Sequence, residues 1–291
     1  MRRSRDVGTS FEWLVRAALC LALGASACAK PSDDGKKGAL EEVDAGHEPG
    51  EVHFRSGPYL LRGFVVKPAG AGPFPVVVYN HGSEAEPSIE WAGALADWFR
   101  GHGFVFFMPY RRGSLGSEGP YWEDVVGRHP VGERVRALVD EMDAQNADVV
   151  AAIDWIREQP YADRARVSVA GCSFGGIQTV LTAEKDLGLS AAVDFAGASA
   201  TWATSPELQV RLKKAVSDAK VPVFFVQAQN DYDTTPSRAL AEAMAAAEKP
   251  HRMRIFPRFG TTPREGHGKF CGYGMNAWGE DVLLFLRQPP R

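Results

Sequence analysis

A serine between glycines follows a short buried strand near the middle of the chain. The strand is predicted over residues 166–170, the pattern Gly-x-Ser-x-Gly is centred on Ser173, and a helix is predicted over residues 177–184. Strand, turn and helix in this order form a nucleophile elbow, whose sharp turn exposes the serine and leaves no room for side chains at Gly171 and Gly175. The sequence therefore predicts Ser173 as a nucleophile for acyl transfer to water.

An acid and a histidine follow Ser173 in the order that such a nucleophile needs. Asp231 comes after a predicted strand over residues 221–227, and Asp233 is the competing acid. His267 lies in a Gly-His-Gly sequence in the loop after a further predicted strand. We expect His267 to be the general base, placed by a loop that its glycines make flexible, and Asp231 to fix the imidazole tautomer.

Two backbone N–H groups are predicted to bind the oxyanion that forms during acyl transfer. Phe174 supplies the first, because it starts the helix after the elbow. The second comes from the loop after a buried strand over residues 74–79, where Ser83 is the first candidate and Glu84 the second. His81 lies in the same loop and is predicted to support it rather than to react.

The elements that must position these groups alternate between strand and helix after an initial β-hairpin. The predicted strands are 74–79, 104–108, 166–170, 190–195, 221–227 and 252–256, and the predicted helices include 89–100, 142–157, 236–247 and 276–286. Such alternation predicts an α/β fold with a mostly parallel central sheet flanked by helices, and an active site at the carboxyl ends of the strands. Residues 113–140 exceed a minimal connection and are predicted to form a partial lid.

Several large side chains near the predicted site have two interpretations. Trp122 in the lid segment and Trp202 before a helix that begins near Ser205 are predicted as substrate contacts, with ordinary packing as the alternative. The pair Arg111 and Arg112 either holds a substrate carboxylate or forms a structural ion pair under the loop. We favour the ion pair.

With these motifs the chain resembles the α/β-hydrolases and, among them, the dienelactone hydrolase family. The resemblance runs from about Glu51 to the C-terminus and rests on the hairpin at 61–68, the strand that leads to His81-Gly82, the segment 104–114, and the elbow with its two downstream partners. It implies the α/β-hydrolase fold and hydrolysis of carboxylic esters or lactones. The family's namesakes carry cysteine where this chain has Ser173, so a dienelactone substrate does not follow from the resemblance.

Cys172 is the alternative nucleophile, because it directly precedes Ser173. An elbow centred on Cys172 would place Ala170 and Phe174 at the positions that need glycine, so we prefer the serine. Cys172 and Cys271 flank the predicted catalytic residues. They either form a disulfide bridge or remain two buried free thiols.

Two other functions are compatible with these motifs. A serine peptidase related to the prolyl oligopeptidases shares the catalytic domain and the Arg-Gly-Ser sequence at residues 112–114, but usually carries a large additional domain that this sequence does not show. A non-catalytic surface lipoprotein could use the fold as a binding scaffold. The complete set of triad candidates in the right order argues against the scaffold.

The amino-acid composition limits the classes of partner that the protein can bind. The formal net charge of −3 at pH 7 provides no basic field for nucleic acid. The histidines show neither the His-Glu-x-x-His pattern nor paired cysteines, so neither a metal nor a cofactor is expected. The expected partner is a small-molecule ester or lactone.

Residues 1–27 are predicted to be an export signal. Arginines precede an apolar stretch over residues 14–25, which is too short to span a bilayer and ends in small residues. Cleavage before Cys28 with lipid attached to its thiol would give a cell-envelope lipoprotein, which we favour, whereas cleavage after the Ala-x-Ala pattern would release a soluble secreted or periplasmic protein. Residues 28–50 are predicted to be a flexible polar tether, and 51–291 the catalytic domain.

Overall fold

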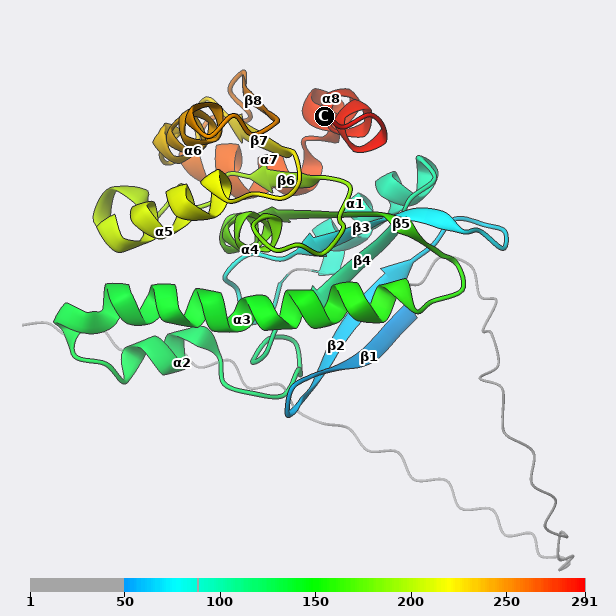
Figure 1. Cartoon of the computed structure of the whole chain (residues 1–291), viewed down its shortest axis with the longest axis horizontal. Coiled ribbons are helices and arrows are strands. Elements are labelled where there is room, and N and C mark those ends of the chain that lie inside the picture. Colours follow the sequence, from blue (N-terminus) through cyan, green and yellow to red (C-terminus); the bar gives the residue numbers. More distant parts are fainter. Residues whose placement is uncertain (1–49, 88, 291) are drawn as a thin grey trace, which may run out of the picture. The chain divides into compact units, whose positions relative to one another are not determined.

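The structure is a computed structural model that describes residues 50–87 and 89–290 (Figure 1). The predicted export signal and the predicted tether up to residue 49 lie outside the described residues. Within the described ranges, no helix has both the length and the apolar character needed to cross a bilayer.

Eight strands form one sheet, in the order β1-β2-β4-β3-β5-β6-β7-β8. They are β1 (Gly50–Ser56), β2 (Tyr59–Val66), β3 (Phe74–Asn80), β4 (Val105–Tyr110), β5 (Ala162–Cys172), β6 (Ala192–Phe195), β7 (Val223–Ala228) and β8 (His251–Phe256). β1 pairs with β2 and β2 with β4 in antiparallel fashion, and all other neighbours are parallel. The predicted mostly parallel sheet is confirmed.

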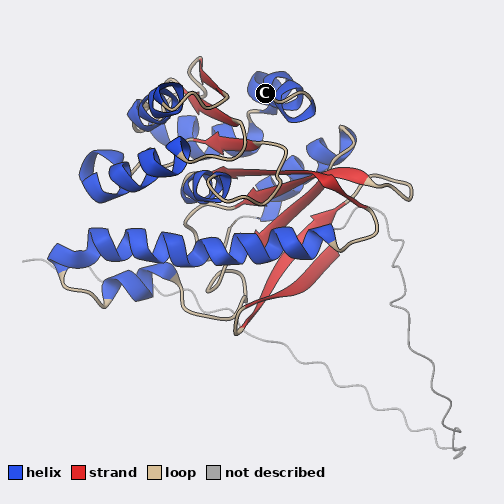
Figure 2. Cartoon of the chain, in the orientation of Figure 1, coloured by secondary structure: helices blue, strands red, loops and turns tan. Residues whose placement is uncertain are grey.

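Helices cover both faces of this sheet (Figure 2). They are α1 (Ile89–Gly101), α2 (Trp122–Gly127), α3 (Arg134–Arg157), α4 (Phe174–Ala183), α5 (Pro206–Ser217), α6 (Thr235–Ala246), α7 (Phe270–Tyr273) and α8 (Met275–Arg287), with short helical turns η1 (Val131–Glu133), η2 (Trp202–Thr204) and η3 (Glu265–Lys269). Helices α3 to α6 bury apolar side chains against one face, and α1, α7 and α8 against the other. Because both faces are covered, β4, β6 and β7 are buried along their whole length.

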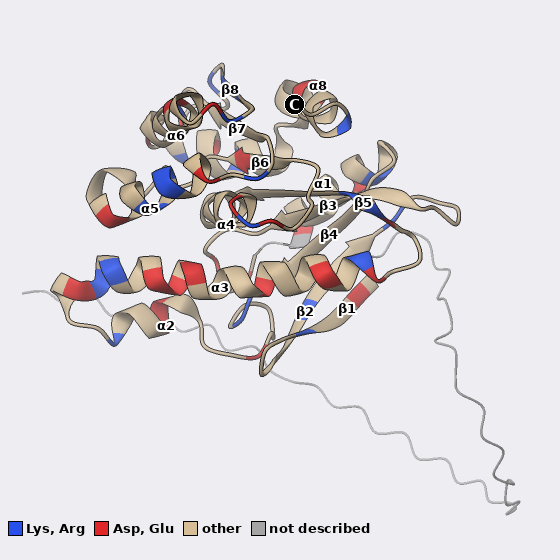
Figure 3. Ribbon diagram, viewed as in Figure 1, with Lys and Arg blue, Asp and Glu red and all other residues tan. Residues whose placement is uncertain are grey.

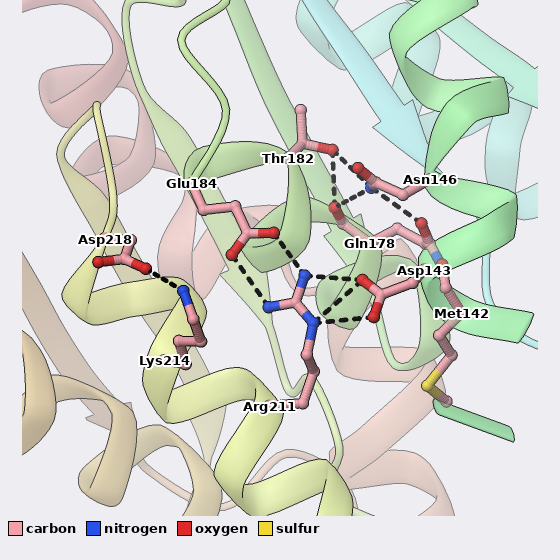
Figure 4. A network of polar contacts seen from close by, with 9 residues as sticks. All are labelled: Met142, Asp143, Asn146, Gln178, Thr182, Glu184, Arg211, Lys214 and Asp218. Atoms are coloured by element: carbon pink, nitrogen blue, oxygen red, sulfur yellow. Dashed lines mark hydrogen bonds and ion pairs between the residues drawn. The ribbon is translucent and has the colours of Figure 1, made fainter. Parts of the chain in front are cut away.

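Hydrogen bonds between polar side chains tie α3, α4 and α5 together (Figure 4). Arg211 of α5 donates to both carboxylate oxygens of Asp143 on α3, at 2.7 Å for the shortest bond, and to the carboxylate of Glu184 at the end of α4. Asn146 of α3 donates to the side-chain and backbone oxygens of Gln178 on α4 at 3.0 Å. Since α4 starts directly after the predicted elbow, these bonds fix the helix that follows the elbow serine.

Figure 3 shows that charges of both signs occur on the helices around the sheet. α3 carries arginines near both ends and aspartates and glutamates between them. The surface of this long helix therefore lacks the continuous basic character that nucleic acid would require.

The predicted and observed boundaries differ most in the lid segment. Residues 113–140 hold α2 and η1, and α3 begins at Arg134 instead of at residue 142. Val135, Leu138, Val139 and Met142 have the spacing of one helix face, so a sequence signal for the earlier start was present, but we interpreted this segment as part of a lid. α2 and η1 both contact α3.

Candidate active site

Ser173 lies in a sharp turn between β5 and α4. Its backbone has φ of 59° and ψ of −117°, a conformation that non-glycine residues rarely adopt. A Cβ atom at Gly171 would overlap the carbonyl oxygen of Gly175, and one at Gly175 would overlap the carbonyl oxygen of Asn80. The Gly-x-Ser-x-Gly sequence thus forms the predicted turn, and its glycines are required by close backbone approach.

The structure brings His267 and Asp231 into contact. His267 Nδ1 lies 2.9 Å from Asp231 Oδ1, and the Asp231 side chain is fully buried. The same carboxylate oxygen accepts bonds from the Ser199 hydroxyl at 2.5 Å and from the Tyr232 backbone N–H at 2.6 Å. With Nδ1 bonded to the carboxylate, Nε2 of the imidazole is left to face a reacting group.

Asp233, the competing acid, serves a different purpose. Its carboxylate accepts the backbone N–H of Thr235 at 2.8 Å, at the start of α6, and its own N–H donates to the Ser199 hydroxyl. A carboxylate at this position satisfies an unpaired helix N–H group and interacts favourably with the helix dipole. Asp231 is therefore the acid that meets His267.

Ser199 was not predicted from the sequence. It lies in the loop after β6, where Ala196 and Ala198 adopt positive φ values of 57° and 63°. Asp194 at the end of β6 holds this loop by accepting the Gly197 N–H at 2.8 Å, and burial raises the pKa of the Asp194 carboxyl to about 7. The run of small residues directly after a buried strand was the available sequence signal for a tight loop at the sheet edge.

The segment around His267 is not the flexible loop that we expected. His267 lies within the π-helical turn η3, which continues directly into α7. A Cβ atom at Gly266 would approach the backbone and side chain of Asn230 to 2.8 Å, so this glycine permits close packing instead of mobility. Asn230 also donates to the carbonyl oxygens of Phe259 and Thr262, at 3.1 and 2.9 Å, which fixes the segment before η3.

Cys172 and Cys271 form a disulfide bridge with a Cα–Cα distance of 6.1 Å. The bridge joins the residue before Ser173 to α7, the helix that follows His267. A sulfur in a disulfide is not a nucleophilic thiolate, so Cys172 does not compete with Ser173 in this state. Of the two interpretations of these cysteines, the bridge is the one observed.

The two predicted oxyanion donors belong to α4 and to the loop after β3. Phe174 is the first residue of α4, whose first internal bond runs from the Ile177 N–H to the Ser173 carbonyl, so the Phe174 N–H has no helical partner. The Ser83 carbonyl accepts bonds from the Tyr121 hydroxyl and from the Trp122 indole N–H, the latter at 3.0 Å. The Ser83 N–H finds no acceptor among the described residues.

Arg111 fastens the same loop from behind. Its guanidinium donates to the carbonyl oxygens of His81 at 3.0 Å and Gly82 at 2.6 Å, and lies 4.9 Å from the centre of the Phe174 ring. Because the Gly82 carbonyl and the Ser83 N–H belong to one peptide plane and point in opposite directions, the bond to Gly82 turns the Ser83 N–H away from Arg111. Burial lowers the pKa of Arg111 to about 10, so the group still carries its charge at neutral pH.

His81 and Arg112 support this arrangement. His81 is fully buried and accepts the Arg111 backbone N–H at Nε2, and burial together with the Arg111 charge holds its pKa well below the usual value. Arg112 donates to Asp148 at 2.7 Å. The structural ion pair that we favoured is present at Arg112, while Arg111 binds carbonyl oxygens, a role not predicted from the sequence.

A cavity of about 290 Å³ opens where these elements meet. Its walls are Gly82, Ser83, Glu84, Trp91, Cys172, Ser173, Ala200, Tyr232, His267, Gly268, Cys271 and Gly272. Another hollow, of about 360 Å³, is lined by residues of β3 and β5 and of the segments 102–104 and 286–287, with Ser190, and holds neither Ser173 nor His267. The predicted nucleophile, base and second oxyanion donor therefore share one cavity at the carboxyl edge of the sheet.

The two predicted tryptophan contacts lie outside the lining of this cavity. Trp122 packs its ring 5.7 Å from that of Phe174 and bonds to the loop carbonyl of Ser83. Trp202 is buried in the core beneath Lys213. Both tryptophans therefore pack against other parts of the protein, which was the alternative interpretation of these residues.

No group of three or more His, Cys, Asp or Glu side chains suited to a metal ion occurs in the part of the chain that the structure describes.

Comparison with known proteins agrees with the family resemblance of the sequence. A family model described as the dienelactone hydrolase family matches residues 61–265. The "Uncharacterized peptidase YtmA" of Bacillus subtilis (strain 168) is 26% identical over 168 residues, which cover 56% of this chain and 58% of that protein. The chain thus spans little more than half the length of that relative.

Solved structures resemble the fold over most of the chain. A putative dienelactone hydrolase from Klebsiella pneumoniae superposes with a TM-score of 0.60 at 19% identity and covers 83% of this chain and 98% of its own. A thermophilic esterase from Thermogutta terrifontis, solved with bound propionate, superposes with a TM-score of 0.56 at 19% identity and covers 84% and 96%. At these identities the similarity concerns the fold.

Proposed function

Because the chain belongs to the dienelactone hydrolase family, we propose that it hydrolyses carboxylic esters or lactones, with Ser173 as nucleophile, His267 as general base and Asp231 as the residue that orients the imidazole. The observation that carries the proposal is the 2.9 Å contact between His267 Nδ1 and Asp231 Oδ1 beside a cavity that both His267 and Ser173 line. The strained backbone at Ser173 supports the same role.

In this mechanism His267 Nε2 takes the proton of the Ser173 hydroxyl as its oxygen attacks the ester carbonyl carbon. The carbonyl oxygen becomes an oxyanion, which the N–H groups of Phe174 and Ser83 bind. The imidazolium then protonates the leaving alcohol, and an acyl-enzyme remains on Ser173. Water, deprotonated by His267, attacks the acyl group, and the collapse of the second tetrahedral intermediate returns the proton to Ser173 and releases the acid.

Asp231 has two tasks in this scheme. Its carboxylate keeps the proton on Nδ1, so that Nε2 can accept the serine proton, and it stabilises the imidazolium that forms. Bonds from Ser199 and from the Tyr232 N–H hold this carboxylate in place. Because Asp231 is buried, its interaction with the imidazolium is weakly screened by solvent.

The decisive experiment is labelling of the purified protein with a fluorophosphonate, read by intact mass, together with turnover of short p-nitrophenyl esters. We expect one adduct and ester turnover in the native protein, and loss of both in Ser173→Ala. Ser190→Ala, which changes a serine remote from the cavity, serves as the control and should keep both activities. Absence of labelling and of turnover in a folded protein would favour the binding-scaffold alternative.

A serine peptidase is the second candidate, since the Bacillus relative is named as a peptidase. The same triad would then cleave an amide, whose poorer leaving group must be protonated by the imidazolium as it departs. Comparison of an acyl-aminoacyl p-nitroanilide with the p-nitrophenyl ester of the same acyl group separates the two. Preference for the ester by more than the intrinsic difference in leaving group supports the esterase.

Export and lipid attachment at Cys28 are part of the proposal. The Cys172–Cys271 bridge supports export, because disulfides persist mainly in oxidising compartments. In cells grown with a labelled fatty acid, we expect the native protein to be labelled and to sediment with membranes, and Cys28→Ser to do neither. An unlabelled native protein with a new N-terminus after residue 27 would instead identify the soluble form.

A further inference from the structure

The cavity beside Ser173 carries a negative charge that the proposed mechanism does not use. Glu84 follows the proposed oxyanion donor Ser83 and is one of the residues that line the cavity. Its side chain folds back over Gly82, another lining residue, so close that a Cβ atom at Gly82 would overlap a carboxylate oxygen. The carboxylate therefore lies near the site of reaction and is exposed to solvent.

No cation within the described residues neutralises Glu84 directly. The cavity lining contains no lysine or arginine, and the part of the chain that the structure describes shows neither an ion pair nor a hydrogen bond to this carboxylate. Arg111 is the nearby positive charge, but it is fully buried and directs its donors to the carbonyl oxygens of His81 and Gly82. Its charge acts on Glu84 from behind the loop and is not presented to a ligand.

Two aromatic rings share the cavity with Glu84. Trp91 of α1 is half-buried with its ring 6.0 Å from that of Tyr79, and Tyr232 is 52% exposed with its ring 5.2 Å from that of His267. Faces of tryptophan and tyrosine attract cations, and alkylated ammonium groups gain most because they are weakly hydrated. A substrate carboxylate, in contrast, would meet an unpaired negative charge here.

We propose that this cavity selects esters that carry a positively charged group, an alkylated or quaternary ammonium, close to the scissile bond. Glu84 is the specificity residue for that charge, and Trp91 and Tyr232 supply the aromatic surface. The inference rests on the proposed ester hydrolysis for its kinetic test but makes an independent statement about binding. With a volume of about 290 Å³, the cavity fits a small ammonium substituent better than a long acyl chain.

The kinetic test uses pairs of substrates that differ only in charge. Acetylcholine and 3,3-dimethylbutyl acetate place the charge on the alcohol, and the p-nitrophenyl esters of trimethylammonioacetic and 3,3-dimethylbutyric acids place it on the acyl group. An ammonium group next to the carbonyl also activates the ester by induction, so each kcat/KM is divided by the rate constant for hydroxide hydrolysis of the same ester. We expect this corrected kcat/KM to favour the cationic member of at least one pair by about tenfold. The pair that shows the cationic preference identifies which side of the scissile bond, alcohol or acyl, faces Glu84.

Glu84→Gln preserves the size of the side chain and removes its charge. In this variant the cationic preference should fall to within about twofold of unity, because the cationic ester loses the attraction of the carboxylate. Glu86→Gln, which changes a neighbouring exposed carboxylate outside the cavity lining, should keep the preference. Equal turnover of both members by the native protein, or a preference that survives in Glu84→Gln, would overturn the proposal.

A binding measurement separates failure of this inference from failure of the proposed function. Benzyltrimethylammonium is titrated against the native protein, Ser173→Ala and Glu84→Gln, with tryptophan fluorescence as the signal because Trp91 lies in the cavity. We expect saturable binding to the first two proteins and at least about fivefold weaker binding to Glu84→Gln. Binding without ester turnover would contradict the proposed hydrolase activity and support the cation site. Ester turnover without charge-dependent binding would support the hydrolase activity and contradict the cation site.

Discussion

The two sides of the cavity are held by different kinds of interaction. On the oxyanion side, the loop after β3 is fixed by hydrogen bonds from Arg111, Tyr121 and Trp122 to three successive carbonyl oxygens, those of His81, Gly82 and Ser83. On the histidine side, a disulfide fixes α7 to the elbow, and a buried carboxylate orients the imidazole.

The difference follows from what each side must do in the proposed reaction. Oxyanion donors are most effective when they are preorganised, because a donor that is already aligned needs no reorganisation when negative charge develops on the carbonyl oxygen. A base must gain and lose a proton, so it needs a partner whose charge favours the imidazolium. Neutral carbonyl oxygens anchored by a buried cation meet the first need, and the Asp231 carboxylate meets the second.

Removal of the charge on the histidine side should give the largest effect. Asp231→Asn keeps the shape of the side chain but favours the wrong imidazole tautomer, and kcat should fall by about 10⁴-fold, as the same exchange does in serine proteases. Steady-state hydrolysis of a p-nitrophenyl ester measures this. Asp233→Asn is the matched control, because its carboxylate bonds to the start of α6, and a comparable loss there would contradict the assignment of the acid.

Loosening the oxyanion side should give the next largest effect. Arg111→Met removes two donors to the loop and leaves the carbonyl oxygens of His81 and Gly82 without them, so kcat should fall by about 10²-fold with little change in KM. Two buried acceptors without partners also lower the free energy of unfolding by about 1–3 kcal/mol each. Arg111→Lys retains a donor, so partial recovery of kcat in this variant would show that Arg111 acts by positioning the oxyanion loop. A rise in KM alone in Arg111→Met would argue against this role.

Cutting the covalent link tests whether the histidine side depends on it. In Cys172→Ala/Cys271→Ala the unfolded chain is freed of a link between residues 99 apart, and the free energy of unfolding should fall by about 2–4 kcal/mol. We expect kcat to fall by about tenfold or less, since Asp231 and η3 still hold His267. Urea titration of the native and variant proteins measures the free energy of unfolding, and steady-state ester hydrolysis measures kcat. An unchanged urea midpoint would mean that packing alone keeps α7 in place.

The smallest effect on activity is expected for the buried carboxyl of Asp194, near the histidine side, where the change is one of stability. Burial raises the pKa of Asp194 to about 7, so in the folded state this group binds its proton more tightly than in the unfolded chain. Its contribution to stability is complete in acid and is lost as the pH rises from about 4 to about 7. Asp194→Asn removes this dependence and retains an acceptor for the Gly197 N–H.

Thermal melting at pH 4.5 and pH 7.5 tests this. Relative to the native protein, Asp194→Asn should gain about 6–12 °C in Tm between the lower and the higher pH, because the raised pKa corresponds to about 3 kcal/mol across this range and each kcal/mol shifts Tm by about 2–4 °C in a domain of this size. Parallel pH profiles of Tm for the two proteins would show that Asp194 does not titrate in this range.

The comparison also explains which features the sequence revealed. The elbow could be predicted because its backbone geometry permits only glycine at two nearby positions, a local constraint that leaves a short pattern. The order of Ser173, Asp231 and His267 was predictable because each follows a strand of the sheet. Arg111 and Ser199 act on residues 29 and 32 positions away, and such contacts depend on packing that no local pattern records.

The lid segment shows the same limit. Trp122 was predicted as a substrate contact from its bulk and its place in a long connection, but its indole N–H donates to the Ser83 carbonyl and the residue is not part of the cavity lining. The π-helical turn around His267 was likewise not visible, since a Gly-His-Gly sequence is typical of a loop. In both cases a partner distant in the sequence decides the local structure.

The disulfide has a consequence for how the protein withstands proteases. The bridge closes the chain from Cys172 to Cys271 into a ring, and Ser173, Asp231 and His267 all lie within that ring. A single cut anywhere inside it, for example at the exposed residues of α5, opens the ring without releasing a fragment. The three residues would then remain on one covalently connected molecule, so a nicked protein keeps its proposed triad together until a second cut or a reductant separates the pieces.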